Sequence, residues 1–459
     1  MPTITTVNPA TGEPLAGYEA FTPSEVDTAI ATTRRAADTW AATPLPRRLA
    51  HLRVLAGELR ASRDALASLI TAEMGKPTAE ALGEVEKSAL TAEYYAANAE
   101  RILADEPVDV GPGAEAWIRC EPLGVVFAVM PWNFPLWQVM RFAVPTLAAG
   151  NTVLLKHSPN VTGSALAIQD LLARAGFPTG ALTALVVAEA DVPAVSERII
   201  ADDRIAAVTL TGSNRAGAAV GAAAGRAVKK AVLELGGSDP FIVLDDADVA
   251  TAAAAAVRAR FTNAGQSCVC AKRFLLHDAI AEEFTARFVA GVRALTVGDP
   301  AHSDMGPLAR ADLRDQLHVQ VEKSVGQGAA LVLGGNPIDG PGHFYEPTVL
   351  TGTGPGVIAF DEETFGPVAA LATAPDDDAL AGLADASEYG LAVSIWTANP
   401  DRAQALARKI TTGAVFVNAV VASDPRLPFG GTKRSGHGRE LAAAGIREFT
   451  TVRTYWVAR

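Results

Sequence analysis

Residues 124–135 read GVVFAVMPWNFP, an apolar run that starts at a glycine and ends in a loop set between two prolines. The run Val125–Met130 is apolar at every position, as in a strand buried on both faces of a parallel sheet. Helix-length segments separate it from four further runs of the same kind, which are Thr152–Leu155, Leu182–Val187, Ala206–Leu210 and Ala231–Leu233. This alternation predicts βαβ units in a parallel sheet.

A second alternating series starts at residue 241 and indicates a second α/β lobe of comparable size. Its expected strands are Phe241–Leu244, Phe274–His277, Ala329–Leu333, Ala369–Ala372, Ser394–Trp396 and Ala414–Val417. Before the first lobe, the sequence TPSE at 22–25 forms a capping box with proline at the first helical position, which predicts the start of a helix. Three further helical patterns follow, at 45–61, 63–74 and 78–103.

Two segments have the character of exposed β-rich ribbons and no obvious place in either lobe. They are 107–121 and the tail after Gly445, which ends TTVRTYWVAR. Exposed strand edges commonly pair with another subunit, so we expect a homodimer or a homotetramer.

The composition argues against several classes of protein. Lys and Arg number 39 against 51 Asp and Glu, and the net charge of −12 disfavours general affinity for nucleic acid or for anionic membranes. Three cysteines do not make a disulfide framework and favour a reducing, cytoplasmic compartment. The N-terminus lacks a signal-peptide pattern, and no apolar run reaches the ~18–20 residues that a membrane helix requires. The seven histidines never fall at metal-ligand spacing, so we expect no metal site.

The sequence FTNAGQSCVCAKR, at 261–273, places Cys268 just after a small polar turn. A free cysteine is most often a small buried hydrophobe, and a core thiol is the simpler interpretation. A nucleophilic thiol would need an oxyanion site and, if its product is hydrolysed, a general base.

Two residues elsewhere could supply these groups. Asn133 lies between the prolines of PWNFP, a stiff setting for a hydrogen-bond donor, and Glu234 ends an apolar strand, where desolvation would raise its pKa. Taken singly, the asparagine is more simply a turn residue and the glutamate part of a solvated loop. The usual G-x-G-x-x-G dinucleotide fingerprint is missing, and Gly212–Gly217 has the glycine spacing of a P-loop without its Lys and Ser/Thr.

Taken together, the motifs make the chain similar to the aldehyde dehydrogenase superfamily over nearly its whole length. They are PWNFP at 131–135, TGS at 211–213, ELGG at 234–237, GQSC at 265–268, EETFGP at 362–367 and PFGGTKRSGHGRE at 428–440. The resemblance implies an α/β fold with a Rossmann-like cofactor-binding domain, a second α/β domain that carries the nucleophile, and a small β ribbon for oligomerisation with a C-terminal tail. We expect the cofactor-binding domain to span 1–106 and 124–235. The catalytic domain would span 236–427, and the ribbon with the C-terminal tail would span 107–123 and 428–459.

For the chemistry, the resemblance implies that the thiolate of Cys268 attacks an aldehyde to give a thiohemiacetal, which hydride transfer converts to a thioester. The side-chain amide of Asn133 and the backbone N–H of Cys268 would form the oxyanion hole. Glu234 would activate the water that hydrolyses the thioester, and could also take the thiol proton.

The resemblance also implies the contacts of a nicotinamide dinucleotide. Ser213 with Gly212 would meet the pyrophosphate at a helix start. Lys156 would reach the adenosine ribose, and Glu363 would hold the nicotinamide ribose. The cofactor channel would be lined by Trp132 and Phe365.

The choice between NAD and NADP depends on the segment after this lysine. NAD-selective members carry a Glu three residues after the lysine, and this chain has Pro159 there. Without that carboxylate, we expect NADP to be used at least as well as NAD. Lys156, with Ser158 or His157, would then lie near the 2′-phosphate.

The substrate expected from the resemblance is succinate semialdehyde. Arg141 lies eight residues beyond Asn133 in an apolar helical pattern, where succinate-semialdehyde dehydrogenases carry an Arg for the substrate carboxylate; a structural salt bridge is the alternative. Ser423 matches a second substrate residue of that branch. Thr262 stands where some members have another Arg, and Arg426 could supply a charge from its loop. Two other functions stay open: oxidation of another small aldehyde, or a non-catalytic binding protein of this fold.

Cys270 follows the nucleophile by two residues. It could form a disulfide with Cys268 under oxidation and switch activity off, or it could be a packing residue. Cys120 shows no functional pattern.

Overall fold

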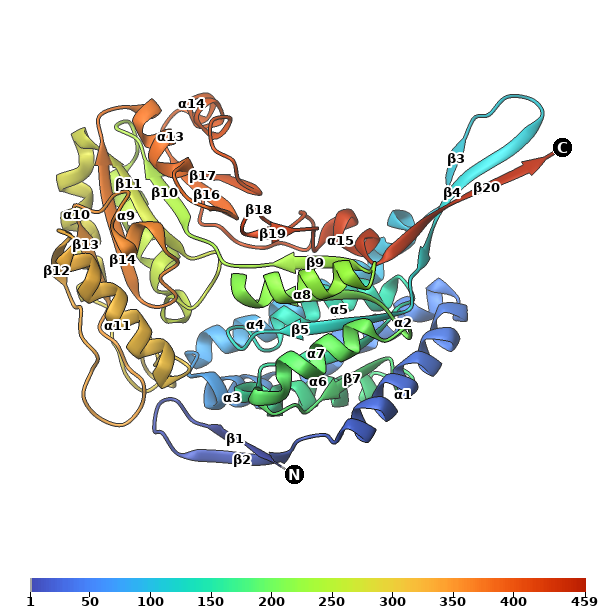
Figure 1. Ribbon diagram of the computed structural model, residues 1–459. Coiled ribbons are helices and arrows are strands. Elements are labelled where there is room, and N and C mark those ends of the chain that lie inside the picture. Colours follow the sequence, from blue (N-terminus) through green and yellow to red (C-terminus); the bar gives the residue numbers. More distant parts are fainter. Residues whose placement is uncertain (1) are drawn as a thin grey trace.

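The computed structural model describes residues 2–459 as two α/β lobes with a ribbon that projects from one of them (Figure 1). The first lobe contains a six-stranded sheet in the order β19-β9-β8-β5-β6-β7. Its strands are β5 (Val125–Met130), β6 (Thr152–His157), β7 (Leu182–Leu185), β8 (Ile205–Thr211), β9 (Lys230–Glu234) and β19 (Gly436–His437). All neighbours are parallel except β19, which runs antiparallel to β9. The five strands predicted from the first apolar series are confirmed.

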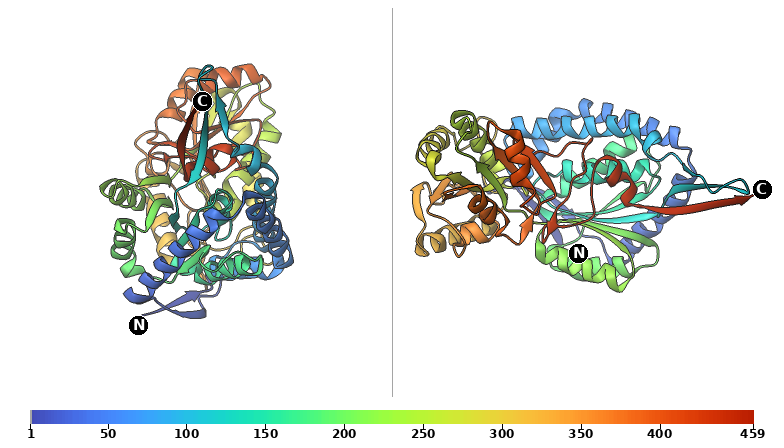
Figure 2. Two further views of the ribbon diagram at one scale, coloured as in Figure 1. Left: turned by 90° about the vertical axis from the view of Figure 1, so that its right-hand side faces the viewer. Right: turned by 90° about the horizontal axis from the view of Figure 1, so that it is seen from above.

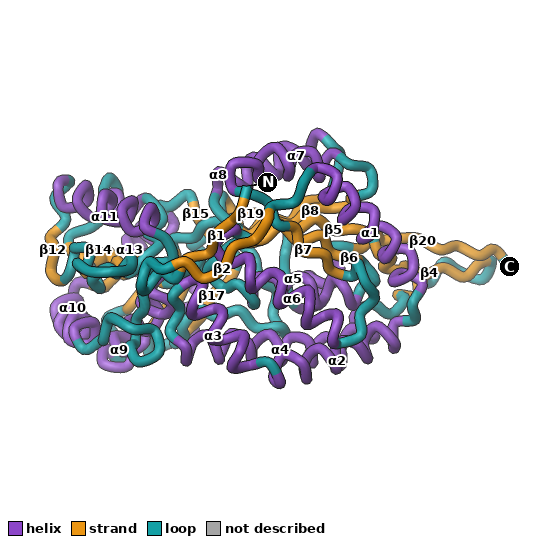
Figure 3. The backbone as a smooth tube through the Cα atoms, turned by 90° about the horizontal axis from the view of Figure 1, so that it is seen from below, coloured by secondary structure: helices purple, strands orange, loops and turns teal. Residues whose placement is uncertain are grey.

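Helices cover both faces of this sheet (Figure 3). Phe127 and Leu154 pack toward α1, α7 and α8, whereas Ala128 and Leu155 pack toward the layer of α2 to α6, because successive residues of a strand point to opposite faces. The helices are α1 (Pro23–Ala42), α2 (Leu45–Ala61), α3 (Arg63–Met74), α4 (Thr78–Ile102), α5 (Trp137–Ala148), α6 (Thr162–Arg174), α7 (Val192–Ala201) and α8 (Asn214–Arg226). The predicted capping box is present at Thr22. An N-terminal hairpin, β1 (Thr3–Val7) and β2 (Pro14–Glu19), and two short 3-10 turns, η1 (Pro159–Val161) and η2 (Glu189–Asp191), complete this lobe.

The second lobe contains a seven-stranded sheet in the order β12-β13-β14-β11-β10-β16-β17. Its strands are β10 (Asp239–Val243), β11 (Ala271–His277), β12 (Ala330–Leu333), β13 (Thr348–Thr351), β14 (Val368–Ala374), β16 (Ala392–Trp396) and β17 (Ala414–Val417). The six predicted strands are confirmed, and β13 was not predicted. The helices are α9 (Val249–Phe261), α10 (Asp278–Arg293), α11 (Ala311–Gly326), α12 (Ile358–Asp361), α13 (Asp377–Asp385) and α14 (Pro400–Ala407), with η3 (Thr262–Gly265) after α9.

The two predicted ribbon segments pair with each other. Strand β4 (Ala114–Pro122) runs antiparallel to β20 (Thr450–Ala458) along its full length, and β3 (Glu106–Val108) pairs with its other edge. The resulting ribbon extends away from both lobes and carries the C-terminus at its tip (Figures 1 and 2). Three large apolar side chains on β20 are exposed to solvent: Val452, Trp456 and Val457.

A short bridge, residues 432–437, joins the two lobes. Its first part, β18 (Thr432–Lys433), pairs with β15 (Tyr389–Gly390), and its last part is β19 in the first sheet. Between them, the buried Ser435 accepts a hydrogen bond from the Gly390 N–H and donates one to the Gly236 carbonyl. Within 428–459, the predicted range for ribbon and C-terminal tail, the ribbon strand is Thr450–Ala458. Helix α15 (Ala442–Glu448) lies between the bridge and this strand.

Within residues 2–459, no helix combines the length and the apolar character needed to cross a bilayer.

Candidate active site

Cys268 follows a turn with an unusual backbone. Three consecutive residues are left-handed: Asn263 (φ 55°), Ala264 (φ 52°) and Gly265 (φ 72°). Left-handed geometry costs a non-glycine residue roughly 1–2 kcal/mol, so the turn needs compensating contacts. The Asn263 side chain donates to the Asn133 carbonyl at 2.8 Å, and its backbone N–H donates to Glu80 at 2.8 Å. These bonds tie the turn to the PWNFP loop and fix the position of Cys268.

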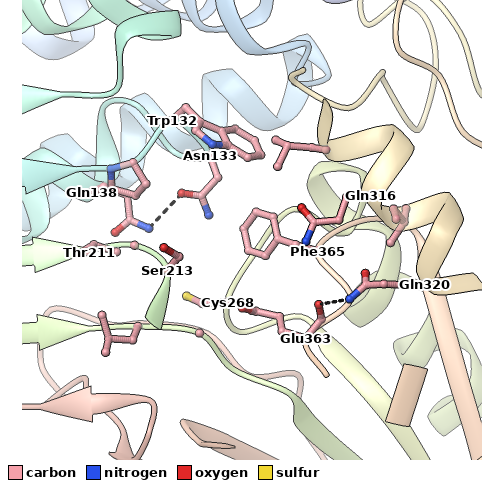
Figure 4. A pocket seen from close by; sticks show the side chains of 16 residues that line it. Trp132, Asn133, Gln138, Thr211, Ser213, Cys268, Gln316, Gln320, Glu363 and Phe365 are labelled. Atoms are coloured by element: carbon pink, nitrogen blue, oxygen red, sulfur yellow. Dashed lines mark hydrogen bonds between the residues drawn. The ribbon is translucent and has the colours of Figure 1, made fainter. Parts of the chain in front are cut away.

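Asn133 lies on the opposite side of the same cavity (Figure 4). Its side-chain N–H₂ donates to the Gln266 carbonyl at 3.0 Å, and its side-chain oxygen accepts from Gln138 at 3.4 Å. An amide carries two N–H donors, and the second has no partner among the described residues. The structure thus brings the two residues together in a shared cavity, in keeping with the oxyanion-hole prediction.

A buried ion pair holds the loop that carries Asn133. Lys76 and Glu84 form this pair, and the other oxygen of Glu84 accepts from the backbone N–H groups of Leu136 and Trp137 at 2.9 Å each. A carboxylate at the start of a helix satisfies the free N–H groups of its first turn. The Lys76 ammonium also lies 3.6 Å from the centre of the Phe134 ring. Helix α5 and the loop are thereby anchored to α4.

His157 contacts the loop that carries Asn133. The prediction that it lies near a 2′-phosphate is wrong. Its Nε2 lies 2.8 Å from the Pro135 carbonyl, and its Nδ1 accepts from the Ser158 N–H at 2.9 Å, which assigns the proton to Nε2. Burial lowers the pKa of His157 to about 4, so the ring is neutral. A neutral ring with both nitrogens engaged cannot serve a 2′-phosphate, and the alternative residue, Ser158, is the one that lines a cavity.

The resting form of Cys268 is a thiol. Burial raises the pKa of Cys268 to about 12, and the opposing effects of Arg141 and Lys272 are smaller. The Lys272 ammonium donates to the carbonyls of Ser267 and Cys268 at 3.0 Å and lies 3.2 Å from Glu363. Its charge therefore orients the nucleophile loop, and a base is needed to form the thiolate.

Glu234 lies at the end of β9 but lines neither cavity that contains Cys268. Burial raises its pKa well above the usual range, with a further contribution from the negative charge of Glu440. Neither carboxylate oxygen has a hydrogen-bond partner among the described residues. A raised pKa gives the Glu234 carboxylate the basicity that a general base needs, but the side chain lines neither cavity beside Cys268.

A cavity of about 280 Å³ opens on one side of Cys268. The rings of Trp132 and Phe365 meet edge to face across it, with centroids 5.7 Å apart (Figure 4). Glu363 is its only charged lining residue and accepts from the Gly237 N–H at 3.1 Å. Ser213 caps the first turn of α8, and Gly212 lies next to it on the wall. Five predicted cofactor residues thus share one cavity.

The other two predicted cofactor residues lie in a second cavity of about 620 Å³. Lys156, Ser158 and Pro159 line its end near β6. Burial lowers the pKa of Lys156 to about 8. Arg215, in the first turn of α8, also lines this cavity and was not predicted. The available signal was a cationic residue two positions after the TGS motif.

A third cavity, of about 270 Å³, lies on the far side of Cys268 and contains both predicted substrate residues. Arg141 lines it, but its guanidinium is paired with the buried carboxylate of Glu440 and lies 4.6 Å from the Phe429 ring centre. The structural salt bridge left open by the sequence is therefore present. Ser423 also lines this cavity.

Sequence reasoning missed Lys87 in this third cavity. Its ammonium donates to Ser423 at 2.8 Å and lies 4.3 Å from the Trp137 ring centre. Burial lowers the pKa of Lys87 to about 8, and nearby Arg141 adds to this effect. In the sequence, a lysine on a long amphipathic helix cannot be distinguished from a solvent-exposed lysine. Only the contacts of Lys87 in the structure show that it lines the cavity.

Cys270 is buried, and its thiol lies 3.8 Å from the Thr262 carbonyl. Burial raises the pKa of this thiol as well. Redox control by Cys270 stays a prediction. Across residues 2–459 no three His, Cys, Asp or Glu side chains are grouped to bind a metal ion.

The chain belongs to the aldehyde dehydrogenase family, whose model matches residues 2–455. Among the relatives, the succinate semialdehyde dehydrogenase (NAD(P)+) of Escherichia coli K12 is 48% identical over 455 residues, which cover 99% of this chain and 97% of the relative. Succinate-semialdehyde dehydrogenase (NADP+) 1 of Mycobacterium tuberculosis H37Rv is 47% identical over 460 residues, covering 99% and 100%. The crystal structure of succinic semialdehyde dehydrogenase from Streptococcus pyogenes with NADP+ superposes with a TM-score of 0.96 at 35% identity, covering 99% and 100% of the two chains.

Proposed function

We propose that this protein oxidises succinate semialdehyde to succinate with NADP or NAD as the hydride acceptor. The observation that carries the proposal is the cavity beside Cys268, whose lining has three cationic residues and no acidic one. Such a lining favours an aldehyde that carries a carboxylate. The names of the relatives agree with this substrate.

The residues present fit a nicotinamide dinucleotide. A Cβ on Gly236 would lie 2.5 Å from a Glu363 oxygen, so the wall beside the aromatic pair is kept clear of side chains. The free N–H groups at the start of α8, beside Gly212 and Ser213, suit a pyrophosphate. Lys156 and Ser158 would hold the adenosine end, and Trp132, Phe365 and Glu363 the nicotinamide end. When bound there, the nicotinamide ring accepts a hydride.

Cys268 and Asn133 would carry out the first half of the reaction. The Cys268 thiol first gives up its proton to solvent. The thiolate then forms a bond to the aldehyde carbon, and the carbonyl oxygen becomes an oxyanion as its π bond breaks. The free N–H of Asn133 and the backbone N–H of Cys268 stabilise this oxygen. Loss of hydride from the same carbon leaves a thioester on Cys268.

Glu234 would act in the second half. Its raised pKa lets the carboxylate take a proton from water near neutral pH. The resulting hydroxide adds to the thioester carbon, the C–S bond breaks, and succinate leaves as Cys268 is regenerated. The carboxyl must rotate from its position near Glu440 to reach this carbon.

The same proposal assigns the lobes and the assembly. Residues 1–106 with 124–235 form the cofactor-binding domain, and residues 236–427 the catalytic domain. The ribbon, with its exposed Trp456, would pair with another copy in a homodimer or homotetramer. A cytoplasmic location is consistent with the free thiols.

A substrate panel tests the proposal. Succinate semialdehyde, glutarate semialdehyde and butanal are each supplied with NADP and with NAD, and reduced nicotinamide is followed by absorbance. We expect the highest kcat/KM for succinate semialdehyde, and NADP at least as effective as NAD. A kcat/KM for butanal equal to that for succinate semialdehyde would refute the substrate, and no turnover of any aldehyde with bound cofactor would favour a binding protein.

A further inference from the structure

The cations of the third cavity are not equivalent. Arg141 is buried with Glu440, and the pair is close to neutral as a unit. Arg141 also has Thr211 as a hydrogen-bond partner at 3.4 Å and Phe429 beneath its plane. Most of its binding capacity is therefore used within the protein.

The second cation, Arg258, lies in the last turn of α9 and is exposed to solvent. Water competes with any anion for an exposed guanidinium, so its contribution to binding is small.

Lys87 is the third cation, and it has no carboxylate at ion-pair distance within the described chain. The acids that act on it are Glu84 and Asp424, and each is already paired, with Lys76 and Arg426 respectively. Its one protein hydrogen bond goes to the Ser423 hydroxyl. An ammonium has three N–H donors, so two have no hydrogen-bond partner among the described residues, and the side chain lines the cavity.

Ser423 completes the arrangement. Because its oxygen accepts from Lys87, its own O–H is free to donate to a third group. The ammonium and the hydroxyl thus form two adjacent donors in the cavity that contains Cys268. A carboxylate can accept from both at once.

We propose that Lys87, together with Ser423, binds the carboxylate of the semialdehyde substrate, and that Arg141 is a positioning residue held by Glu440. This inference rests on the proposed function, because it needs an aldehyde with a carboxylate at its far end. Trp137 lies under the ammonium and fixes the lysine side chain over the cavity.

The test compares Lys87→Met with Lys87→Arg, using succinate semialdehyde and butanal as paired substrates. Methionine keeps the length of the side chain and removes the charge. We expect Lys87→Met to lower kcat/KM for succinate semialdehyde by about 100-fold, mainly through KM, while butanal changes by less than about threefold. Lys87→Arg should keep the preference for the acid to within about tenfold of the wild type.

Inhibition by succinate gives a second measurement. With butanal as the varied substrate, succinate should compete with it in the wild type, and its inhibition constant should rise by about 100-fold in Lys87→Met. Arg101→Met removes an exposed charge from the same helix α4 and should change neither value.

Three results would count against the assignment in different ways. Equal losses with both substrates in Lys87→Met would make the lysine structural. If Lys87→Met kept the wild-type preference for succinate semialdehyde over butanal, Arg141 would be the residue that binds the carboxylate. A wild type without preference for succinate semialdehyde over butanal would overturn the proposed function itself, whatever the variants do.

Discussion

The two cavities that meet at Cys268 are nearly equal in size, about 280 and 270 Å³, but their charges are opposite. Among the described residues, the first cavity has Glu363 as its only charged lining residue, and the third cavity has three cations and no acid. An oxidised nicotinamide ring is positively charged and a semialdehyde acid is negatively charged. The difference teaches that the charged residues lining each cavity suit a different reactant, so that the two reactants can approach the nucleophile from different sides.

The largest effect is expected at the wall that both cavities share. Cys268→Ala removes the nucleophile, and steady-state oxidation of succinate semialdehyde should fall by about 10⁴-fold or more. Fluorescence titration should show NADP binding within about twofold of the wild type, because the first cavity keeps its other walls. Activity within tenfold of the wild type would exclude covalent catalysis by this residue.

Glu234 lies outside both cavities, and its removal should separate the two halves of the reaction. In Glu234→Gln, rapid mixing should give a burst of about one reduced nicotinamide per site, followed by turnover about 10²–10⁴-fold slower than in the wild type. The burst is expected because thioester formation needs no water. A uniform slowing without a burst would assign Glu234 to thiol activation instead.

Pro159→Glu would add a negative charge to the second cavity, where the adenosine end of the cofactor is proposed to bind. A carboxylate beside Lys156 and Ser158 would repel a 2′-phosphate, so kcat/KM for NADP should fall by about 10–100-fold while that for NAD changes little. Pro159→Gln is the matched control for the loss of the proline. Equal changes with both cofactors would mean that residue 159 acts through the backbone.

The smallest effect is a pH dependence of substrate preference, which arises in the third cavity. The groups that act on Lys87 are Arg141, Glu84, Asp424 and Cys268, and the net result with burial is a pKa of about 8. The carboxylate needs the ammonium form, which predominates below this pKa and is lost above it. The ratio of kcat/KM for succinate semialdehyde to that for butanal should therefore fall by about tenfold between pH 7 and pH 9. Any titration of Cys268 affects both substrates and cancels in the ratio, so a flat ratio would contradict the prediction.

Most of the fold followed from local patterns. Eleven expected strands rested on apolar runs bounded by turns, and each is present. Strand β13, with sequence TVLT, was missed because only two of its four residues are apolar, so it does not stand out as an apolar run. The left-handed backbone at 263–265 could not be predicted from the sequence either, because it depends on hydrogen bonds to the distant residues Glu80 and Asn133.

The site was predictable where motifs carry the chemistry and not where distant charges meet. Cys268 and Asn133 were placed in one cavity by motif order alone. The pairing of Arg141 with Glu440 joins residues far apart in the chain, and Lys87 meets Ser423 across a similar separation. Sequence spacing gives no information on such contacts, because the partners are brought together only by the packing of α4 and α5 with the segments before and after the bridge.

The bridge of residues 432–437 has a mechanical consequence. Its backbone is hydrogen-bonded to β15 at one end and to β9 at the other. The lobes can therefore separate only if backbone hydrogen bonds at one of the two ends are broken first. We expect substrate and product to travel through the cavity mouths while the lobes keep their spacing. Gly436 faces Glu234 in the ladder, so any sliding of one lobe past the other would reach that carboxylate directly.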